Sequence, residues 1–222
     1  MTNLEPNTQC SLCPRLVDYR IANQATYPDF HNAPVPSFGP LSAELLVVGL
    51  APGLKGANRS GRPFTGDDAG DLLYPTLLTF GLATGTYGAS ADDGLRLSGC
   101  RITNAVRCAP PQNKVIGAEI TACNAFLSDE IKAMPNIKAL IALGLVAHNA
   151  VLKAFDYKLS AFKFAHCAQH DLGNGLVLTD SYHCPRYNTN TGRLTEAISP
   201  NVFRAARVLE SGRCALISGV CR

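Results

Sequence analysis

The sequence has no tryptophan, two methionines and few charged residues, and these scarcities narrow the possible classes of protein. Charged residues make up only 17% of the 222 residues and hydrophobic ones 46%, a balance that favours a buried core over a disordered chain. The longest uncharged apolar run is Ala139–Ala147, well short of the roughly 18 residues that span a membrane. The N-terminus shows no signal segment. We therefore expect one cytoplasmic domain over residues 1–222, with no membrane partner.

Cysteine is also too scarce for a disulfide scaffold, because the chain has nine, an odd number. In a reducing cytoplasm, spaced cysteines indicate metal binding or catalysis. Cys10 and Cys13 form a C-x2-C pair, and Cys108 and Cys123 would complete the four ligands of an iron–sulfur cluster or of zinc. The spacing does not choose between the two metals, and a buried core position is the alternative for Cys123.

Short apolar runs alternate with helical patterns along the chain. Such an alternation predicts a three-layer α/β/α sandwich with a central, mainly parallel four-stranded sheet. The sequence predicts strands over 44–50, 100–106, 137–143 and 176–181 and helices over 68–80, 117–134, 144–155 and 199–210. A ligand is expected beyond the carboxyl ends of such strands.

The distribution of charge indicates a polyanion more clearly than the net charge of +3 does. Three segments without acidic residues hold nine of the 20 Lys and Arg residues, namely 45–66, 95–118 and 181–195. They follow the first, second and fourth predicted strands, so we expect them to meet at one edge of the sheet as a positive face. Chance clustering on a solvated surface is the alternative.

The loop after the first strand, Gly49–Leu73, reads GLAPGLKGANRSGRPFTGDDAGDLL. Its glycines let the backbone approach a ligand closely, but no G-K-[ST] follows, so it is not a P-loop. Phe64 could stack on a flat ring or merely anchor the loop. Of Asp67 and Asp68, one is expected to cap the following helix and the other to orient a water or stabilise a cation.

This loop resembles the first motif of the uracil-DNA glycosylase superfamily, in particular the B-type enzymes of family five. ITNAVRCAPPQNK (Ile102–Lys114) is similar to the second-strand segment of the iron–sulfur families four and five, and SYHCPRYNTNTGRLT (Ser181–Thr195) to their histidine motif. Leu50 stands where family four has glutamate, which favours family five. The usual His-Pro-Ser is here His183-Cys184-Pro185, which puts the roles of the last two residues in doubt.

The resemblance implies a monofunctional glycosylase of base-excision repair. It would flip uracil, and other deaminated bases such as hypoxanthine, out of single- or double-stranded DNA and hydrolyse the N-glycosidic bond, leaving an abasic site. It also implies a structural 4Fe–4S cluster that ties the N-terminal segment to the domain, and a monomer associated with the nucleoid. A non-catalytic, metal-stapled DNA-binding module on the same fold is the alternative.

The resemblance also implies roles for single residues. Phe64 would stack on the flipped base, with Gly53 beside it, and Asn104 would read the edge of the base. Asp67, which the register of the motif favours over Asp68, would serve the water or the sugar cation, and His183 would donate a hydrogen bond to uracil O2. The expected DNA contacts are Lys55, Asn58, Arg59, Arg62, Ser181, Arg186, Tyr187, Asn190 and Arg193.

Overall fold

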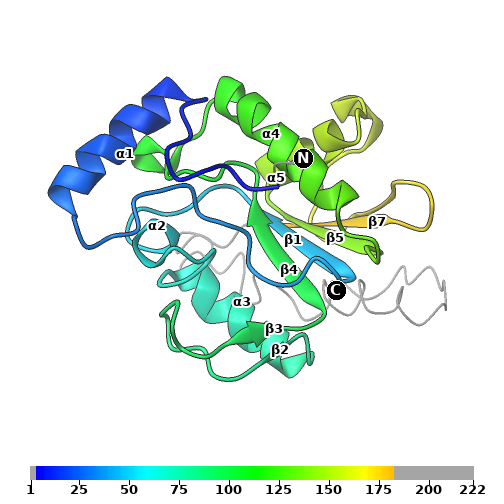
Figure 1. Ribbon diagram of the computed structural model, residues 1–222. Helices are drawn as coiled ribbons and strands as arrows, with labels where there is room; N and C mark the ends of the chain where they lie inside the picture. Colours follow the sequence, from blue (N-terminus) through cyan, green and yellow to red (C-terminus); the bar gives the residue numbers. More distant parts are fainter. Residues whose placement is uncertain (1–3, 183–222) are drawn as a thin grey trace.

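The computed structural model describes residues 4–182, which fold around a five-stranded sheet in the order β4-β1-β5-β7-β6 (Figure 1). The strands are β1 Leu45–Gly49, β4 Cys100–Asn104, β5 Ala139–Leu143, β6 Gln169–Asp171 and β7 Val177–Ser181. β4, β1, β5 and β7 pair in parallel, and β6 lies antiparallel to β7 at one edge. The predicted α/β sheet is confirmed, with one strand more than expected.

Helices cover both faces of this sheet, which gives the predicted three layers (Figure 1). α3 (Asp68–Thr79) packs on the face that includes Val47, whereas α4 (Gly117–Lys132) and α5 (Leu145–Ala154) pack on the face that includes Leu46. All residues of β1, β4 and β5 are buried, because a parallel sheet between two helical layers has no solvated face.

Several short or polar elements have no counterpart in the sequence prediction. α1 (Pro14–Thr26) buries little apolar surface, and α2 (Ala57–Ser60) is a single turn inside the glycine-rich loop. β2 (Ala83–Thr84) and β3 (Arg96–Leu97) form a separate two-stranded hairpin, which lies beside α3 (Figure 1). The remaining pieces are two 3-10 turns, Pro111–Asn113 and Leu159–Ala161. The predicted helix over 199–210 lies outside the described residues. Within residues 4–182, no helix is long and apolar enough to cross a bilayer.

Candidate active site

The carboxyl ends of β1 and β4 place two residues from different motifs at one point. Gly49 pairs in register with Asn104. A Cβ atom added to Gly49 would lie 2.5 Å from Asn104 Oδ1 and 2.5 Å from Phe64 Cζ, so the amide and the ring both lie against the Gly49 backbone. Only glycine leaves this space open. The structure therefore brings Phe64 and Asn104 together at the edge where a parallel sheet binds ligands.

Phe64 adopts a strained backbone conformation. Its φ of +51° lies in the left-handed region, which costs a side-chain-bearing residue about 1–3 kcal/mol and persists only where the surroundings enforce it. The side chain is 6% exposed and packs with the core under α3. A Cβ on Gly70 would lie 1.7 Å from the Phe64 carbonyl oxygen, so the start of α3 is pressed against this carbonyl. The loop thus holds the ring in one place.

The sequence predicted that one of Asp67 and Asp68 caps the helix and that the other serves the chemistry, but the structure gives the cap to Asp67, the residue that the motif favours for the chemistry. Asp67 is the N-cap of α3, and its Oδ1 accepts a hydrogen bond of 3.0 Å from the Gly70 N–H. Its Oδ2 lies against the glycine turn: a Cβ on Gly56 would lie 2.8 Å from it and one on Gly53 would lie 3.9 Å away. Asp68 is exposed in the first turn of the helix. Asp67 is therefore the carboxylate that lies inside the loop.

Four cysteine side chains line one pocket. Cys10 and Cys13 precede and begin α1, Cys108 follows β4, and Cys123 lies in α4. The rest of the lining is mostly apolar, with Pro6, Leu12, Leu16, Val17, Arg20 and Arg107. The four cysteines that the sequence suggested as ligands therefore line the same pocket.

The same pocket contains a buried donor without an acceptor. Arg20 is 7% exposed and donates from Nη2 to the Cys10 carbonyl at 3.0 Å, whereas Nη1 has no hydrogen-bond partner. Burial, together with the neighbouring thiols, raises the pKa of Cys13 to about 11 and that of Cys108 to about 12. Without a cation nearby these thiols stay protonated, and a bound metal group would replace their protons. The unpaired Arg20 Nη1 would need an acceptor in the same pocket.

Comparison with known sequences decides the family. The profile of the Uracil DNA glycosylase superfamily matches residues 36–207, which include Phe64, Asp67 and Asn104. The chain belongs to this superfamily. A type-5 uracil-DNA glycosylase of Thermus thermophilus is 42% identical over 207 residues, which cover 91% of this chain and 94% of that protein.

Two further members of the superfamily are similar over most of their length. A type-5 uracil-DNA glycosylase of Pyrobaculum aerophilum is 39% identical over 201 residues, covering 89% of this chain and 87% of that protein. One of Mycobacterium bovis is 39% identical over 208 residues, covering 90% and 78%. The resemblance to family five that the motifs indicated is therefore confirmed.

Three of the predicted DNA contacts of this superfamily member are buried and bonded within the protein, which corrects the sequence prediction. Arg62 is 4% exposed, and its guanidinium forms two hydrogen bonds to Asp93, of 2.8 and 2.7 Å. Asn58 is 4% exposed and donates from Nδ2 to Asn32 Oδ1 at 2.9 Å. Ser181 is buried at the end of β7 and donates to the Tyr182 carbonyl. The polar groups of these side chains are therefore engaged within the protein.

The positive face is smaller than the charge pattern suggested. Arg101 and Arg107 are buried as well, and both pair with Glu130, at 2.5 and 2.7 Å. By contrast, Lys55 and Arg59 are exposed on the loop that carries Phe64 and Asp67. Arg59 Nη2 would lie 2.7 Å from a Cβ on Gly66, so the guanidinium covers the turn just before Asp67. The predicted site residues His183, Arg186, Tyr187, Asn190 and Arg193 lie outside the described residues.

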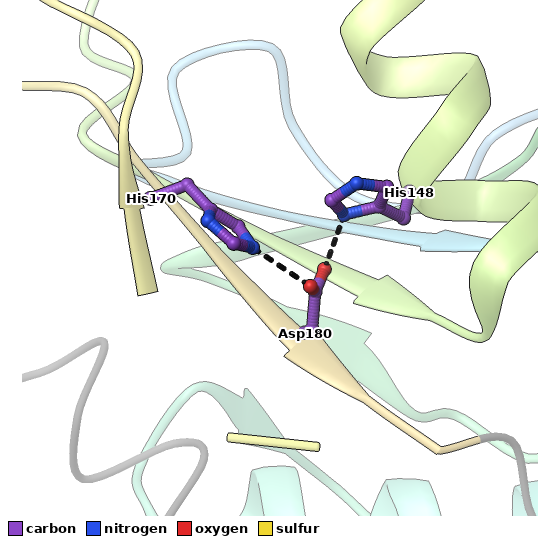
Figure 2. A group of neighbouring side chains, drawn as sticks. All are labelled: His148, His170 and Asp180. Carbon is purple, nitrogen blue, oxygen red and sulfur yellow. Dashed lines mark hydrogen bonds and ion pairs between the residues drawn. The ribbon is translucent and has the colours of Figure 1, made fainter. Parts of the chain in front are cut away.

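A buried cluster in this superfamily member was not predicted at all (Figure 2). Asp180, in β7, accepts from His148 Nδ1 at 2.7 Å and from His170 Nε2 at 2.8 Å. The ligand atoms of the three residues lie within 4.8 Å of one another, which would also suit a metal ion, but separations of 2.7 and 2.8 Å are those of hydrogen bonds. His148 Nε2 faces the Phe162 carbonyl at 3.2 Å. Both nitrogens of His148 therefore lie within hydrogen-bond distance of an oxygen atom, so the ring is held in one orientation.

The residues that sequence reasoning missed share one property: their partners are distant in the sequence. Asp93 lies 31 residues from Arg62, and Asp180 lies 32 residues from His148. No local motif marks either pair. The only available signal for Asp93 was its place in a loop rich in Gly, Ser and Ala, where a carboxylate commonly shapes a turn.

Proposed function

We propose that this chain is a monofunctional uracil-DNA glycosylase of base-excision repair. Its substrates would be uracil and other deaminated bases such as hypoxanthine, in single- or double-stranded DNA. The observation that carries the proposal is the meeting of Phe64 and Asn104 at Gly49, with Asp67 on the same loop. Membership of the superfamily and the names of the type-5 relatives support it.

The proposed pocket reads the base with one ring and one amide. Phe64 would stack on the flipped base, a contact that contributes roughly 1–3 kcal/mol. The Asn104 amide carries a donor and an acceptor, as does the Watson–Crick edge of uracil. The backbone near Gly53 would lie close to the sugar or base, because no side chain stands there. Asn104 is 3% exposed, so its hydrogen bonds to a base would form with little competition from water.

The proposed chemistry is hydrolysis. The bond between C1′ and N1 breaks, and its electron pair leaves with uracil, so positive charge develops on the sugar and negative charge on the base. The oxygen of a water then bonds to C1′, and one proton of that water passes to the surrounding solvent or to the base. Asp67 would stabilise the sugar cation or orient the water, and His183 would donate to O2 as charge develops there. No step forms a bond between the enzyme and the sugar.

We further propose that the four cysteines hold a 4Fe–4S cluster that ties the N-terminal segment to the domain. The donor set fits, because four thiols and the unpaired Arg20 Nη1 line one pocket, and cluster sulfur atoms accept hydrogen bonds. One zinc ion would hold four thiolates about 3.8 Å apart. Within the described residues, no three of these cysteine sulfurs lie within 4.8 Å of one another. A four-iron cube spaces its ligands more widely, since each iron takes one thiolate.

The test for the cluster is elemental analysis of the purified protein. A brown protein with about four irons per chain is the expected result. A colourless protein with one zinc per chain would overturn this part of the proposal. The cluster would supply structure and no electrons, since the proposed hydrolysis is not a redox reaction.

The test for the activity uses a labelled DNA duplex with a single uracil, followed by alkaline cleavage of abasic sites and detection of free uracil. The parent should release uracil without cutting the strand before alkali. Asp67→Asn is the variant to compare with the parent, because asparagine caps helices as well as aspartate does but carries no charge. We expect that variant to bind the duplex and cleave it at least about 100-fold more slowly.

The remaining possibility, a non-catalytic DNA-binding module, predicts a different result in the same assay. The parent would then bind the duplex and release no uracil. We also propose that the protein acts as a monomer on DNA in the cytoplasm, close to the nucleoid. Light scattering at several concentrations would test the first point, with a constant mass near 23.6 kDa expected.

A further inference from the structure

The strained loop around Phe64 is held in place by residues that take no part in the proposed reaction. Phe64 has a φ of +51°, and a side chain stays in such a conformation only when its neighbours enforce it. Backbone groups on both sides of Phe64 form hydrogen bonds with tyrosine side chains. The Tyr74 hydroxyl donates to the Pro63 carbonyl, and the Gly66 N–H donates to the Tyr87 hydroxyl at 3.3 Å. Tyr74 of α3 therefore holds the peptide group before Phe64, and Tyr87, which lies between β2 and β3, holds the peptide group between Thr65 and Gly66.

Arg62 lies at the centre of this arrangement. Its Nη1 and Nη2 donate to Asp93 Oδ1 and Oδ2 at 2.8 and 2.7 Å, and its Nε donates to Thr65 Oγ1 at 2.7 Å. The planar guanidinium thus makes all three of these hydrogen bonds to side chains of the protein itself. Its Cζ lies 5.1 to 5.9 Å from the centres of three rings, those of Phe38, Tyr74 and Tyr87.

Asp93 links this guanidinium to a different part of the chain. It accepts from the Gly88 N–H at 2.9 Å and from the Leu95 N–H at 3.0 Å, so the carboxylate closes the turn before β3. The Arg62 hydrogen bond is the largest cause that lowers the pKa of Asp93, which stays ionised. The ion pair is almost fully buried, with side chains 5% and 6% exposed. The hairpin segment is thereby fastened to the loop that carries Phe64 and Asp67.

We propose that Arg62 and Asp93 are a positioning pair, which holds Phe64 and Asp67 in the geometry needed for base excision. Thr65, to which Arg62 donates a hydrogen bond, lies between Phe64 and Asp67 in the sequence. A buried ion pair adds little net stability compared with packed apolar residues, whereas a planar, two-pronged contact fixes direction. This inference rests on the proposed function, and it reassigns an arginine that the sequence suggested for a phosphate.

The test compares Arg62→Lys and Asp93→Asn with Arg101→Lys. Lysine keeps the charge of Arg62 but cannot bond both carboxylate oxygens and Thr65 at once. Arg101→Lys is the matched control, because Arg101 is also a buried arginine bound to a carboxylate, Glu130, outside this loop. The measurements are single-turnover cleavage of a uracil duplex, DNA affinity at several salt concentrations, and thermal stability.

We expect Arg62→Lys and Asp93→Asn each to slow single-turnover cleavage at least tenfold. DNA affinity should stay within about twofold and its salt dependence unchanged, because no phosphate contact is lost. The double variant should be no slower than the slower single variant, since the two residues act as one unit. Arg101→Lys should lose thermal stability to a similar degree but cleave at the parent rate.

Two results would overturn the proposal. Cleavage by Arg62→Lys at the parent rate would show that the pair does not position the loop. A slope of affinity against salt that flattens by about one unit would return Arg62 to the phosphate contacts. If Arg101→Lys slows cleavage equally, the effect reflects stability alone, and the proposal fails.

A second readout separates this inference from the proposed function. With 4-fluorophenylalanine in place of the nine phenylalanines, the 19F signal of Phe64 is assigned by its loss in Phe64→Leu. We expect one sharp signal in the parent and a broadened or split one in Arg62→Lys. If the parent releases no uracil, the proposed function fails, while this spectrum still decides whether the pair holds Phe64. An unchanged Phe64 signal in Arg62→Lys rejects the positioning role in either case.

Discussion

At the scale of single residues, Gly49 sets the space between the proposed base reader and the proposed stacking ring. A methyl group at this position would lie 2.5 Å from atoms of both Asn104 and Phe64, well inside van der Waals contact. We predict that Gly49→Ala folds but cleaves a uracil duplex about 100-fold more slowly. A displacement of about 1 Å at a reacting centre can cost that much. The rate is measured in single turnover, so that product release does not mask the effect.

Gly117→Ala is the control for this prediction. A Cβ at Gly117, the first residue of α4, would meet nothing within 4 Å. Replacing glycine by alanine in an open helical position stabilises a protein by about 0.4–1 kcal/mol. Gly117→Ala should therefore be slightly more stable and fully active. If Gly49→Ala is equally active, Phe64 and Asn104 move apart at no cost, and the pocket is more adaptable than its packing indicates.

The motifs of the sequence point to candidate site residues but do not reveal contacts between distant segments. Phe64, Asn104 and Asp67 were identified from motifs, because each motif keeps its own residues close in sequence. Arg62 was placed wrongly, because its partner Asp93 is 31 residues away and only the folded chain brings them together. An arginine in an acid-free segment looks like a phosphate ligand until the distant carboxylate is located. The pairs of Arg101 and Arg107 with Glu130 escaped notice for the same reason.

At the scale of elements, the buried strands were predictable and the exposed ones were not. β1, β4, β5 and β7 were each placed within two residues. β1 and β5 are continuous apolar runs, as expected of strands covered on both faces, whereas β4 and β7 carry polar residues among the apolar ones. β6 reads Gln-His-Asp and pairs on one side only, so its sequence has no apolar signature. α1 was missed because most of its residues are polar, and it is held through Leu16 and the region of the cysteines.

The end of β7 is fastened by a third histidine, outside the cluster around Asp180, and this predicts a dependence of stability on pH. His166 Nδ1 accepts from the Tyr182 N–H at 3.2 Å, and the two rings stack. Burial lowers the pKa of His166 below the ordinary value. The unfolded chain then binds a proton at a higher pH than the folded chain does. The stabilisation is complete above about pH 6.5 and is lost as the pH falls through the unfolded pKa towards the folded one.

We predict that His166→Asn reduces this loss of stability on the acid side. Asparagine has no proton to gain, and its carbonyl oxygen can still accept from the Tyr182 N–H. Urea unfolding of the parent and the variant between about pH 8 and pH 5 measures the difference. The other ionisable groups are the same in both proteins, so their contributions cancel in the comparison. Parallel pH profiles for the two proteins would contradict the prediction.

At the scale of the whole molecule, binding to DNA should depend on fewer cations than the charge pattern suggests. Of the cations in the first acid-free segment, Lys55 and Arg59 are exposed, whereas Arg62 is buried. We predict that Lys55→Ala and Arg59→Ala each flatten the slope of log affinity against log salt by about one unit. Fluorescence anisotropy over a range of salt concentrations gives the slope. Unchanged slopes in both variants would mean that DNA approaches from another side.

The cysteine pocket joins parts of the chain that are distant in sequence, so the proposed cluster should stabilise the fold as a whole. We predict that Arg20→Lys loses iron to a chelator several-fold faster than the parent, because the two Nη atoms of arginine reach separate acceptors, whereas the single nitrogen of lysine lies at one point. Arg15→Lys is the control: Arg15 also lies in α1, but it pairs with Glu119 and does not line the pocket. The decay of visible absorbance follows the loss of iron. Equal decay in all three proteins would show that Arg20 does not contact the cluster.

Asp67 is at once the cap of a helix and the carboxylate proposed for catalysis, so a single base change in its codon could separate folding from activity. Aspartate codons become asparagine codons when their guanine is replaced by adenine, which is the outcome of deaminating the cytosine opposite. Asparagine would keep α3 capped, so the product would fold and still bind uracil in DNA while cleaving it poorly. One unrepaired lesion at this codon would therefore yield a protein that covers other lesions and shields them from repair.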